Sequence, residues 1–284
     1  MKGRIVEIAK NSPLYPNEWK TLFDAPETLY AVGNISLLQK RKFVIVGARR
    51  TPPPALKLGG KIAKELSDGF AIVTGTADGG DAAVIEGVLA GSGEVICLLA
   101  GGFSSLPQGN LQLLEEVAKR GLLLSPHPYE TEVRAYSYEY RNKLLATLGE
   151  GILVLGAGEK SGALITAKYA KAQGKPVFAF PYFPASAVGT GCNELLKSGG
   201  ILTENAFDIA SKMGINLEAK VKKVELSKEE EKLLSVLKDN AEGHIALLAE
   251  GAGLPVFKAK AVLSALEVKG LVVSLGGNRY APVS

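Results

Sequence analysis

Short runs of apolar and β-branched residues alternate with amphipathic stretches through the middle of the 284-residue chain. Such runs predict strands with both faces buried, and the stretches between them predict helices. Since connections between parallel strands are almost always right-handed, this order predicts an α/β fold, a Rossmann-like doubly wound parallel sheet. The expected strands are residues 43–46, 70–74, 95–99, 122–124, 152–155 and 177–180, and the expected helices are 55–67, 81–90, 110–119, 138–148 and 163–173.

Both ends of the chain differ in pattern from this α/β region. Residues 1–40 contain the single Trp and several Pro. They are too few to fold alone, so we expect them to pack on the core as an N-terminal extension. Residues 41–215 are the expected Rossmann-like domain, and the Lys-rich residues 216–225 are the expected linker.

Residues 226–284 predict a separate domain of three helices and a terminal hairpin. Ser227 and Glu230 have the spacing of a capping box at the start of the first helix. The glycines at 276 and 277 predict the tight turn of the hairpin. This order is typical of a winged helix-turn-helix, in which the third helix, residues 255–269, holds the position of the DNA-recognition helix. This domain has few exposed cations, so we weigh DNA binding and protein binding equally as its function.

Composition excludes several classes of protein. With 46% hydrophobic and 22% charged residues the chain is globular and is not disordered. Apolar runs fall short of the ~18–20 residues of a membrane span, and no secretory signal begins the chain, so we expect a cytoplasmic protein without a membrane partner. The net charge of +4 permits a polyanionic partner. Two dispersed cysteines and two dispersed histidines do not predict a metal site.

Glycine-rich turns follow the first two expected strands. Gly47, Arg49 and Arg50 come after the first, and Gly75 and Gly79 after the second. Ligands of open parallel sheets bind beyond the carboxyl ends of the strands, where glycines let the backbone approach a phosphate and arginines donate to it. Neither G-x-G-x-x-G nor a P-loop motif is present, so we expect no dinucleotide or other cofactor.

A second cluster combines basic, aromatic and hydroxyl side chains. Arg141, Asn142 and Lys143 lie beside three tyrosines, at 136, 138 and 140, and Ser161, Gly162 and Thr166 open the helix after the fifth strand. Cations interleaved with aromatic rings are typical of single-stranded nucleic-acid sites, and a helix start attracts phosphate. The alternatives are core packing for the tyrosines, and a structural ion pair with a helix cap for Arg141 and Asn142.

Taken in order, these segments resemble the DNA-processing protein A (DprA/Smf) family. The segments Val44-Ile45-Val46-Gly47-Ala48-Arg49, Arg141-Asn142-Lys143-Leu144-Leu145-Ala146 and Ser161-Gly162-Ala163-Leu164-Ile165-Thr166 match motifs of that family. The resemblance implies a homodimer that binds single-stranded DNA without catalysis, protects incoming DNA during natural transformation and helps to load a RecA-type recombinase. It also implies that Arg49, Arg141, Asn142, Lys143, Ser161, Gly162 and Thr166 line the phosphate pocket.

The chain departs from the family pattern at a few positions. Ala48 replaces a serine, Asp78 stands where the family carries arginine, and Glu86 replaces a second arginine. Because a carboxylate repels phosphate, we expect a lower DNA affinity or an altered strand path. We also expect a weak sequence preference, because backbone contacts and stacking do not read base edges.

Two other functions compete with DNA binding. One is a nucleotide-processing hydrolase on a Rossmann-like fold, although the catalytic glutamate motif of the phosphoribohydrolases is missing from the sequence. The other is a protein-binding adaptor that acts through the winged helix. No Ser-His-Asp or Cys-His set can be assembled from the isolated histidines, which favours a protein that is not an enzyme.

Overall fold

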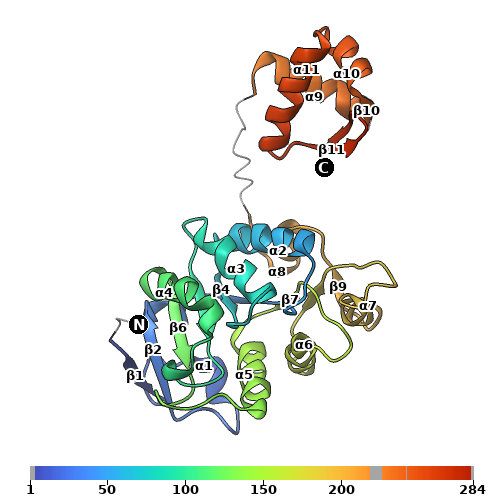
Figure 1. Cartoon of the computed structure of the whole chain (residues 1–284). Helices are drawn as coiled ribbons and strands as arrows, with labels where there is room; N and C mark the ends of the chain where they lie inside the picture. Colours follow the sequence, from blue (N-terminus) through green and yellow to red (C-terminus); the bar gives the residue numbers. More distant parts are fainter. Residues whose placement is uncertain (1–3, 218–225, 241, 283–284) are drawn as a thin grey trace. The chain divides into compact units, whose positions relative to one another are not determined.

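The computed structural model describes residues 4–217, 226–240 and 242–282. The chain divides into two compact units, Met1–Leu217 and Glu218–Ser284 (Figure 1). Of the expected linker, residues 216–225, all but the first two positions lie outside the described residues. Among the described residues, no helix is both long and apolar enough to cross a membrane.

The first unit is built on a nine-stranded sheet, counted over the described residues, with the order β1-β2-β6-β5-β4-β3-β7-β8-β9. All pairs from β6 to β9 are parallel, which confirms the predicted fold class. The strands are β1 (Val6–Ala9), β2 (Thr28–Gly33), β3 (Lys42–Val46), β4 (Ala71–Thr74), β5 (Val95–Leu98), β6 (Leu122–Ser125), β7 (Ile152–Val154), β8 (Val177–Ala179) and β9 (Ile201–Leu202).

Helices cover both faces of this sheet and create two hydrophobic cores. In β3, Val44 and Val46 face the core shared with α1, α5 and α6, whereas Phe43 and Ile45 face the core shared with α2, α3 and α4. The helices are α1 (Asn17–Lys20), α2 (Pro53–Leu66), α3 (Gly80–Leu89), α4 (Leu111–Arg120), α5 (Ala135–Leu148), α6 (Gly162–Ala172), α7 (Thr190–Lys197) and α8 (Ala206–Met213), with 3₁₀ turns η1 (Ile35–Gln39), η2 (Phe103–Ser105) and η3 (Gln108–Asn110).

The N-terminal segment contributes strands that the sequence analysis did not predict. β1 pairs with β2, and β2 pairs with β6, both antiparallel, so the sheet is mixed at this edge. Trp19 is fully buried, and its indole N–H donates to the carbonyl of Leu144 at 2.9 Å. The expectation of a purely parallel sheet was therefore incomplete, because alternating burial along β2 does not produce a continuous apolar run.

The strand order reverses beside β3. From β3 the chain moves outward through β4, β5 and β6, and it then returns to place β7 on the other side of β3 (Figure 1). This is a topological switch point, where the loops that follow two neighbouring strands diverge to opposite faces of the sheet. The carboxyl ends of β3 and β7 therefore border a natural site for a ligand.

The second unit has its own hydrophobic core. Leu233, Leu237, Leu248, Leu263 and Tyr280 are among its buried residues. Its helices are α9 (Lys228–Asn240), α10 (Ile245–Ala252) and α11 (Val256–Val268), and its sheet has the order β10 (Gly243–His244), β12 (Arg279–Pro282), β11 (Val272–Gly276). The assignment of a winged helix to this unit stays a prediction.

The start of α9 carries the predicted capping box. The backbone N–H of Ser227 donates to the Glu230 carboxylate at 2.7 Å, and the N–H of Glu230 donates to the Ser227 hydroxyl at 3.2 Å. The Lys269 ammonium also contacts Glu230, at 2.7 Å. These contacts tie the first helix of the unit to the end of α11.

Candidate nucleic-acid interface

A cavity of about 320 Å³ lies beyond the carboxyl end of β3, at the switch point. We call it the switch-point cavity. The loop after β3, the start of α3, one face of α5 and the start of α6 all contribute to it, and its lining comprises Val46, Gly47, Ala48, Arg49, Ala77, Asp81, Tyr138, Arg141, Asn142, Ser161, Gly162, Ala163 and Thr166.

The loop after β3 is held by backbone contacts that only glycine permits. The N–H of Ala48 donates to the carbonyl of Gly156 at 2.8 Å, and the N–H of Gly80 donates to the carbonyl of Ala48 at 3.3 Å. A Cβ on Gly80 would lie 2.4 Å from the Cα of Gly47, so the loop and α3 could not approach with a side chain there. Arg49, the residue after Ala48 on this loop, lies at the rim of the cavity.

Arg49 is exposed, and among the described residues its guanidinium has neither a hydrogen bond nor an ion pair. An arginine in that state keeps all its donors for a ligand. Its position at the rim makes it the cation of the cavity that is most available to an anion.

Helix α5 presents Tyr138, Arg141 and Asn142 on one face, because residues three and four apart in a helix lie together. Arg141 is only 7% exposed. Its Nε donates to the Asn142 side-chain oxygen at 3.1 Å, and its guanidinium carbon lies 5.9 Å from the centre of the Tyr138 ring. Asn142 in turn donates to the carbonyl of Gly162 at 3.1 Å, which connects α5 to the start of α6.

Asp81 is buried near Arg141, and the charges of the two side chains influence each other. Burial raises the pKa of the Asp81 carboxyl, and the nearby Arg141 charge and the N–H of Ala77 act in the opposite direction. Burial also lowers the pKa of Arg141, with Asp81 again opposing. An arginine stays protonated in any protein, so the pair is a compensated charge in the floor of the cavity. Part of the Arg141 charge is thus already neutralised.

The start of α6 forms the opposite wall. The Ser161 hydroxyl caps the helix by accepting from the N–H of Ala163 at 3.3 Å, and the Thr166 hydroxyl donates to the carbonyl of Gly162 at 3.4 Å. The positive end of the helix dipole therefore points toward the space in front of Gly162. An anion in the cavity would be attracted by this helix start as well as by Arg49.

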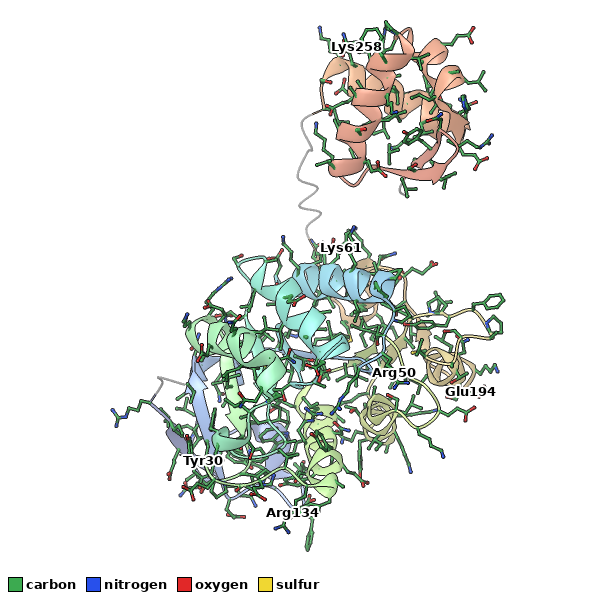
Figure 2. All side chains as sticks on the ribbon, in the orientation of Figure 1. Tyr30, Arg50, Lys61, Arg134, Glu194 and Lys258 are labelled. Carbon is green, nitrogen blue, oxygen red and sulfur yellow. The ribbon has the colours of Figure 1, made fainter. Side chains whose placement is uncertain are left out.

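The structure brings together Gly47, Arg49, Arg141, Asn142, Ser161, Gly162 and Thr166 of the predicted site residues. It places the other four elsewhere. Arg50, labelled in Figure 2, is exposed on the same loop but does not line the cavity. Lys143 is on another face of α5, where its ammonium pairs with Asp24 at 2.5 Å. Gly75 and Gly79 lie behind the lining, against the Arg141 side chain and the Arg49 backbone respectively.

The structure adds Asp81 and Tyr138 to the predicted set. Asp81 directly follows Gly79-Gly80, so an acidic residue at a predicted helix start was the available signal. Of the three neighbouring tyrosines, only Tyr138 lines the cavity. Tyr140 is packed against the core shared with α1, α5 and α6, and its hydroxyl donates to the carbonyl of Asp24 at 2.7 Å. Core packing was the right alternative for Tyr140.

An open Rossmann-like sheet with a cavity at its switch point is typical of α/β proteins that bind a ligand there. The sequence model of the DNA recombination-mediator protein A family matches residues 7–214, and the chain belongs to that family. The match covers most of the first unit and does not include the second.

Known relatives agree with this assignment. DNA processing protein DprA of Bacillus subtilis is 37% identical over 205 residues, which are 71% of this chain and 69% of that protein. Protein Smf of Synechocystis is 34% identical over 206 residues, which are 70% of this chain and 52% of that protein. This chain thus spans about half of the second relative's length.

Two solved structures of DNA processing protein A share the fold. The Streptococcus pneumoniae protein has a TM-score of 0.70 at 28% identity, with 74% of each chain covered. The Helicobacter pylori protein has a TM-score of 0.68 at 28% identity, with 75% of this chain and 96% of that chain covered, and its structure concerns the single-stranded DNA binding mode of that protein.

Proposed function

We propose that the switch-point cavity binds the sugar–phosphate backbone of single-stranded DNA. The observation that carries this proposal is the exposed guanidinium of Arg49, unpaired within the described part of the chain, at the rim of a cavity that also contains the start of α6. Both groups attract phosphate. The relative from Helicobacter pylori, whose single-stranded DNA binding mode has been described, supports the same ligand here.

Tyr138 supplies a surface for a base. Its side chain is 41% exposed and lines the cavity together with Arg49 and Arg141. Aromatic rings beside a phosphate-binding groove stack on bases regardless of sequence, since every base has a flat π-face. One nucleotide could therefore place its phosphate at Arg49 and its base against Tyr138.

We propose that no catalytic step follows binding. None of the residues that line the cavity is a histidine or a cysteine, and the one carboxylate of the lining, Asp81, is buried against Arg141. Within this lining, then, no carboxylate or imidazole is free to take or give a proton as hydrolysis requires, and Asp78 in the adjoining cavity is the carboxylate that a hydrolase would have to use. Incubation with nucleoside monophosphates should release no free base, and release at enzymatic rates would favour the hydrolase instead.

Replacing Arg49 by alanine tests the proposed DNA site. The variant should bind a labelled single-stranded oligonucleotide more weakly at any sequence. The slope of log K against log salt should fall by roughly 0.7, because one phosphate contact and its released counterions are lost. Fluorescence anisotropy over a range of salt concentrations measures both quantities.

Arg50→Ala is the matched control for this test. It removes the same charge one residue away, from a side chain that does not line the cavity. If both variants lose equal affinity, the effect is one of overall charge, and the switch-point cavity is not the site. If Arg49→Ala binds as the parent does, the assignment of Arg49 is wrong.

We further propose, on the basis of family membership, that the chain acts in the cytoplasm as a homodimer, protects incoming single strands and helps to load a RecA-type recombinase. Light scattering at tens of micromolar protein should give about twice the monomer mass. Loading is measured by recombinase ATP hydrolysis on single strands coated with single-strand-binding protein, with and without this chain. A failure to accelerate loading would restrict the proposal to DNA protection.

Protein binding by the second unit is a second candidate function. Leu247, Val256 and Phe257 are 67%, 50% and 78% exposed on α10 and α11. Exposed apolar side chains of this size favour a protein partner over a nucleic acid. If residues 1–217 bind DNA but fail to support recombinase loading, the second unit carries the protein contact. If they support loading fully, it does not.

A further inference from the structure

A second cavity, of about 470 Å³, adjoins the switch-point cavity. The two share Arg49, Ala77, Tyr138 and Arg141, so they form two compartments on either side of these side chains. Apolar walls come from Leu99, Pro107 and Val133, and polar groups come from Asp78, Gln108 and Ser105. Polar and apolar residues share this lining, so it offers both contact area and hydrogen-bonding groups to a small flat ligand.

Asp78 adds an exposed carboxylate to this second compartment, which it lines together with Arg49 and Arg141. It follows β4 on the loop to α3, it is exposed, and among the described residues its carboxylate has no hydrogen bond or ion pair. A free carboxylate repels phosphate and accepts hydrogen bonds from amino groups. The backbone of a bound strand should therefore stay at Arg49, while a donor group is favoured at Asp78.

The position of the Asp78 carboxylate is set by the turn η3. A Cβ on Gly109 would lie 3.3 Å from one Asp78 carboxylate oxygen, so that oxygen lies over the glycine. The Asn110 side chain donates to the carbonyl of Thr76 at 3.2 Å, which holds η3 against the Asp78 loop. Gln108, on the same turn, also lines the compartment. An acceptor and an amide donor thus face one space.

We propose that the second compartment receives a base of the bound strand and that Asp78 accepts a hydrogen bond from the exocyclic amino group of that base. The inference rests on the proposed DNA-binding function and adds a preference to it. Cytosine carries an amino group beside a ring acceptor, whereas uracil and thymine carry a carbonyl oxygen in its place. A carboxylate attracts the amino group and repels the carbonyl oxygen. The sequence analysis predicts a weak preference for DNA sequence, and this hydrogen bond would add a stronger preference at one base position.

The test compares oligodeoxycytidylate with oligodeoxyuridylate of equal length at neutral pH, because the two bases differ at this edge in the amino group. The parent chain should bind the cytidylate strand about tenfold more tightly, within the range that base-edge hydrogen bonds provide. Asp78→Ala should bring the ratio of the two affinities close to one, and Asp78→Asn, whose amide oxygen still accepts but carries no charge, should lower the ratio less. Both variants should bind uridylate at least as tightly as the parent does, because a repulsive charge is gone.

Glu86→Gln is the matched control. Glu86 is an exposed carboxylate on α3 that lies outside the lining of both cavities. Its removal should leave the affinity ratio unchanged, because overall charge affects both oligonucleotides equally. Circular dichroism melts verify that each variant is folded.

Three results would overturn the inference. Equal binding of the two strands by the parent would leave the DNA site intact and remove the base preference. A ratio that persists in Asp78→Ala would show that another group reads the base. Failure of the parent to bind either strand would contradict the proposed function itself, and the inference with it.

Discussion

At the scale of single residues, the two arginines of the switch-point cavity have different tasks. Arg49 is exposed and unpaired among the described residues, whereas Arg141 is buried beside Asp81 and bonded to Asn142. A phosphate that approached Arg141 would compete with an existing carboxylate, but at Arg49 it would meet a hydrated cation without a partner. We therefore expect Arg49 to govern affinity and Arg141 to govern the shape of the cavity.

Removing the Asp81 carboxylate tests the structural task of this pair. Asp81→Ala should lower the free energy of unfolding of the first unit by about 1–3 kcal/mol, because the N–H of Ala77 loses its acceptor and the buried Arg141 loses an attractive charge. Urea unfolding of the full chain, followed by circular dichroism, measures this loss.

Asp24→Ala is the control for Asp81→Ala. It breaks the ion pair between Asp24 and Lys143. The two side chains are 42% and 25% exposed, and ion pairs this exposed contribute roughly 0–1 kcal/mol to the free energy of unfolding. Similar losses in the two variants would mean that Arg141 does not depend on Asp81.

The residue-scale content of the site could be predicted only in part. Glycines, arginines and hydroxyls near predicted strand ends were visible in the sequence, and seven of the eleven predicted positions line one cavity. Arg141 and Lys143 are two positions apart, however, and the helix turns one into the cavity and the other toward Asp24. Helical phase relative to the sheet depends on tertiary packing, which a local motif does not encode.

At the scale of elements, the strands that could be predicted were those with an unbroken run of apolar residues. β3, β4, β5 and β6 are buried at every position, and the apolar runs located them within a residue or two. β1 has only one buried residue and β9 has two residues in total, so neither left a periodic signal. Short or half-exposed strands form because a neighbouring edge offers hydrogen bonds, which is a long-range cause.

The capping box of α9 leads to a prediction about pH. The hydrogen bond from Lys269 and the N–H of Ser227 lower the pKa of Glu230 below its ordinary value. A carboxyl with a lowered pKa in the folded state stabilises the fold above its ordinary pKa, and this contribution is lost as the pH falls through the folded pKa. Glu230→Gln should destabilise the second unit by about 1 kcal/mol near neutral pH and by progressively less below pH 4.

Hydrogen exchange of the α9 amides in the full chain measures this effect at each pH. Glu229→Gln serves for comparison. The Glu229 and Lys258 side chains are 39% and 46% exposed, so their ion pair contributes little to stability. A Glu230→Gln effect that is equal at both ends of the pH range would contradict the assigned role of the charge.

At the scale of the whole molecule, the proposed DNA site belongs entirely to the first unit. Every residue that lines the switch-point cavity lies between positions 46 and 166. In the second unit, Lys258, Lys269 and Arg279 are paired with Glu229, Glu230 and Glu242. Phosphate binding at these three cations would have to displace a carboxylate, whereas at Arg49 it would not.

Deletion of the second unit should consequently change DNA affinity little. A chain of residues 1–217, which retains both cores of the first unit, should bind single strands within about threefold of the full chain, because every residue that lines the proposed site is retained. Anisotropy titrations of the two chains at one salt concentration provide the comparison. A loss of binding on deletion would make the second unit the DNA reader.

The reversal of strand order at β3 also affects how the protein is made. β3 pairs with β7, yet β4, β5 and β6 with their helices are synthesised between the two. On the ribosome, the glycine loop and Arg49 emerge long before α5 and α6 exist to enclose the cavity. A nascent chain can therefore have no complete switch-point cavity until translation has passed α6.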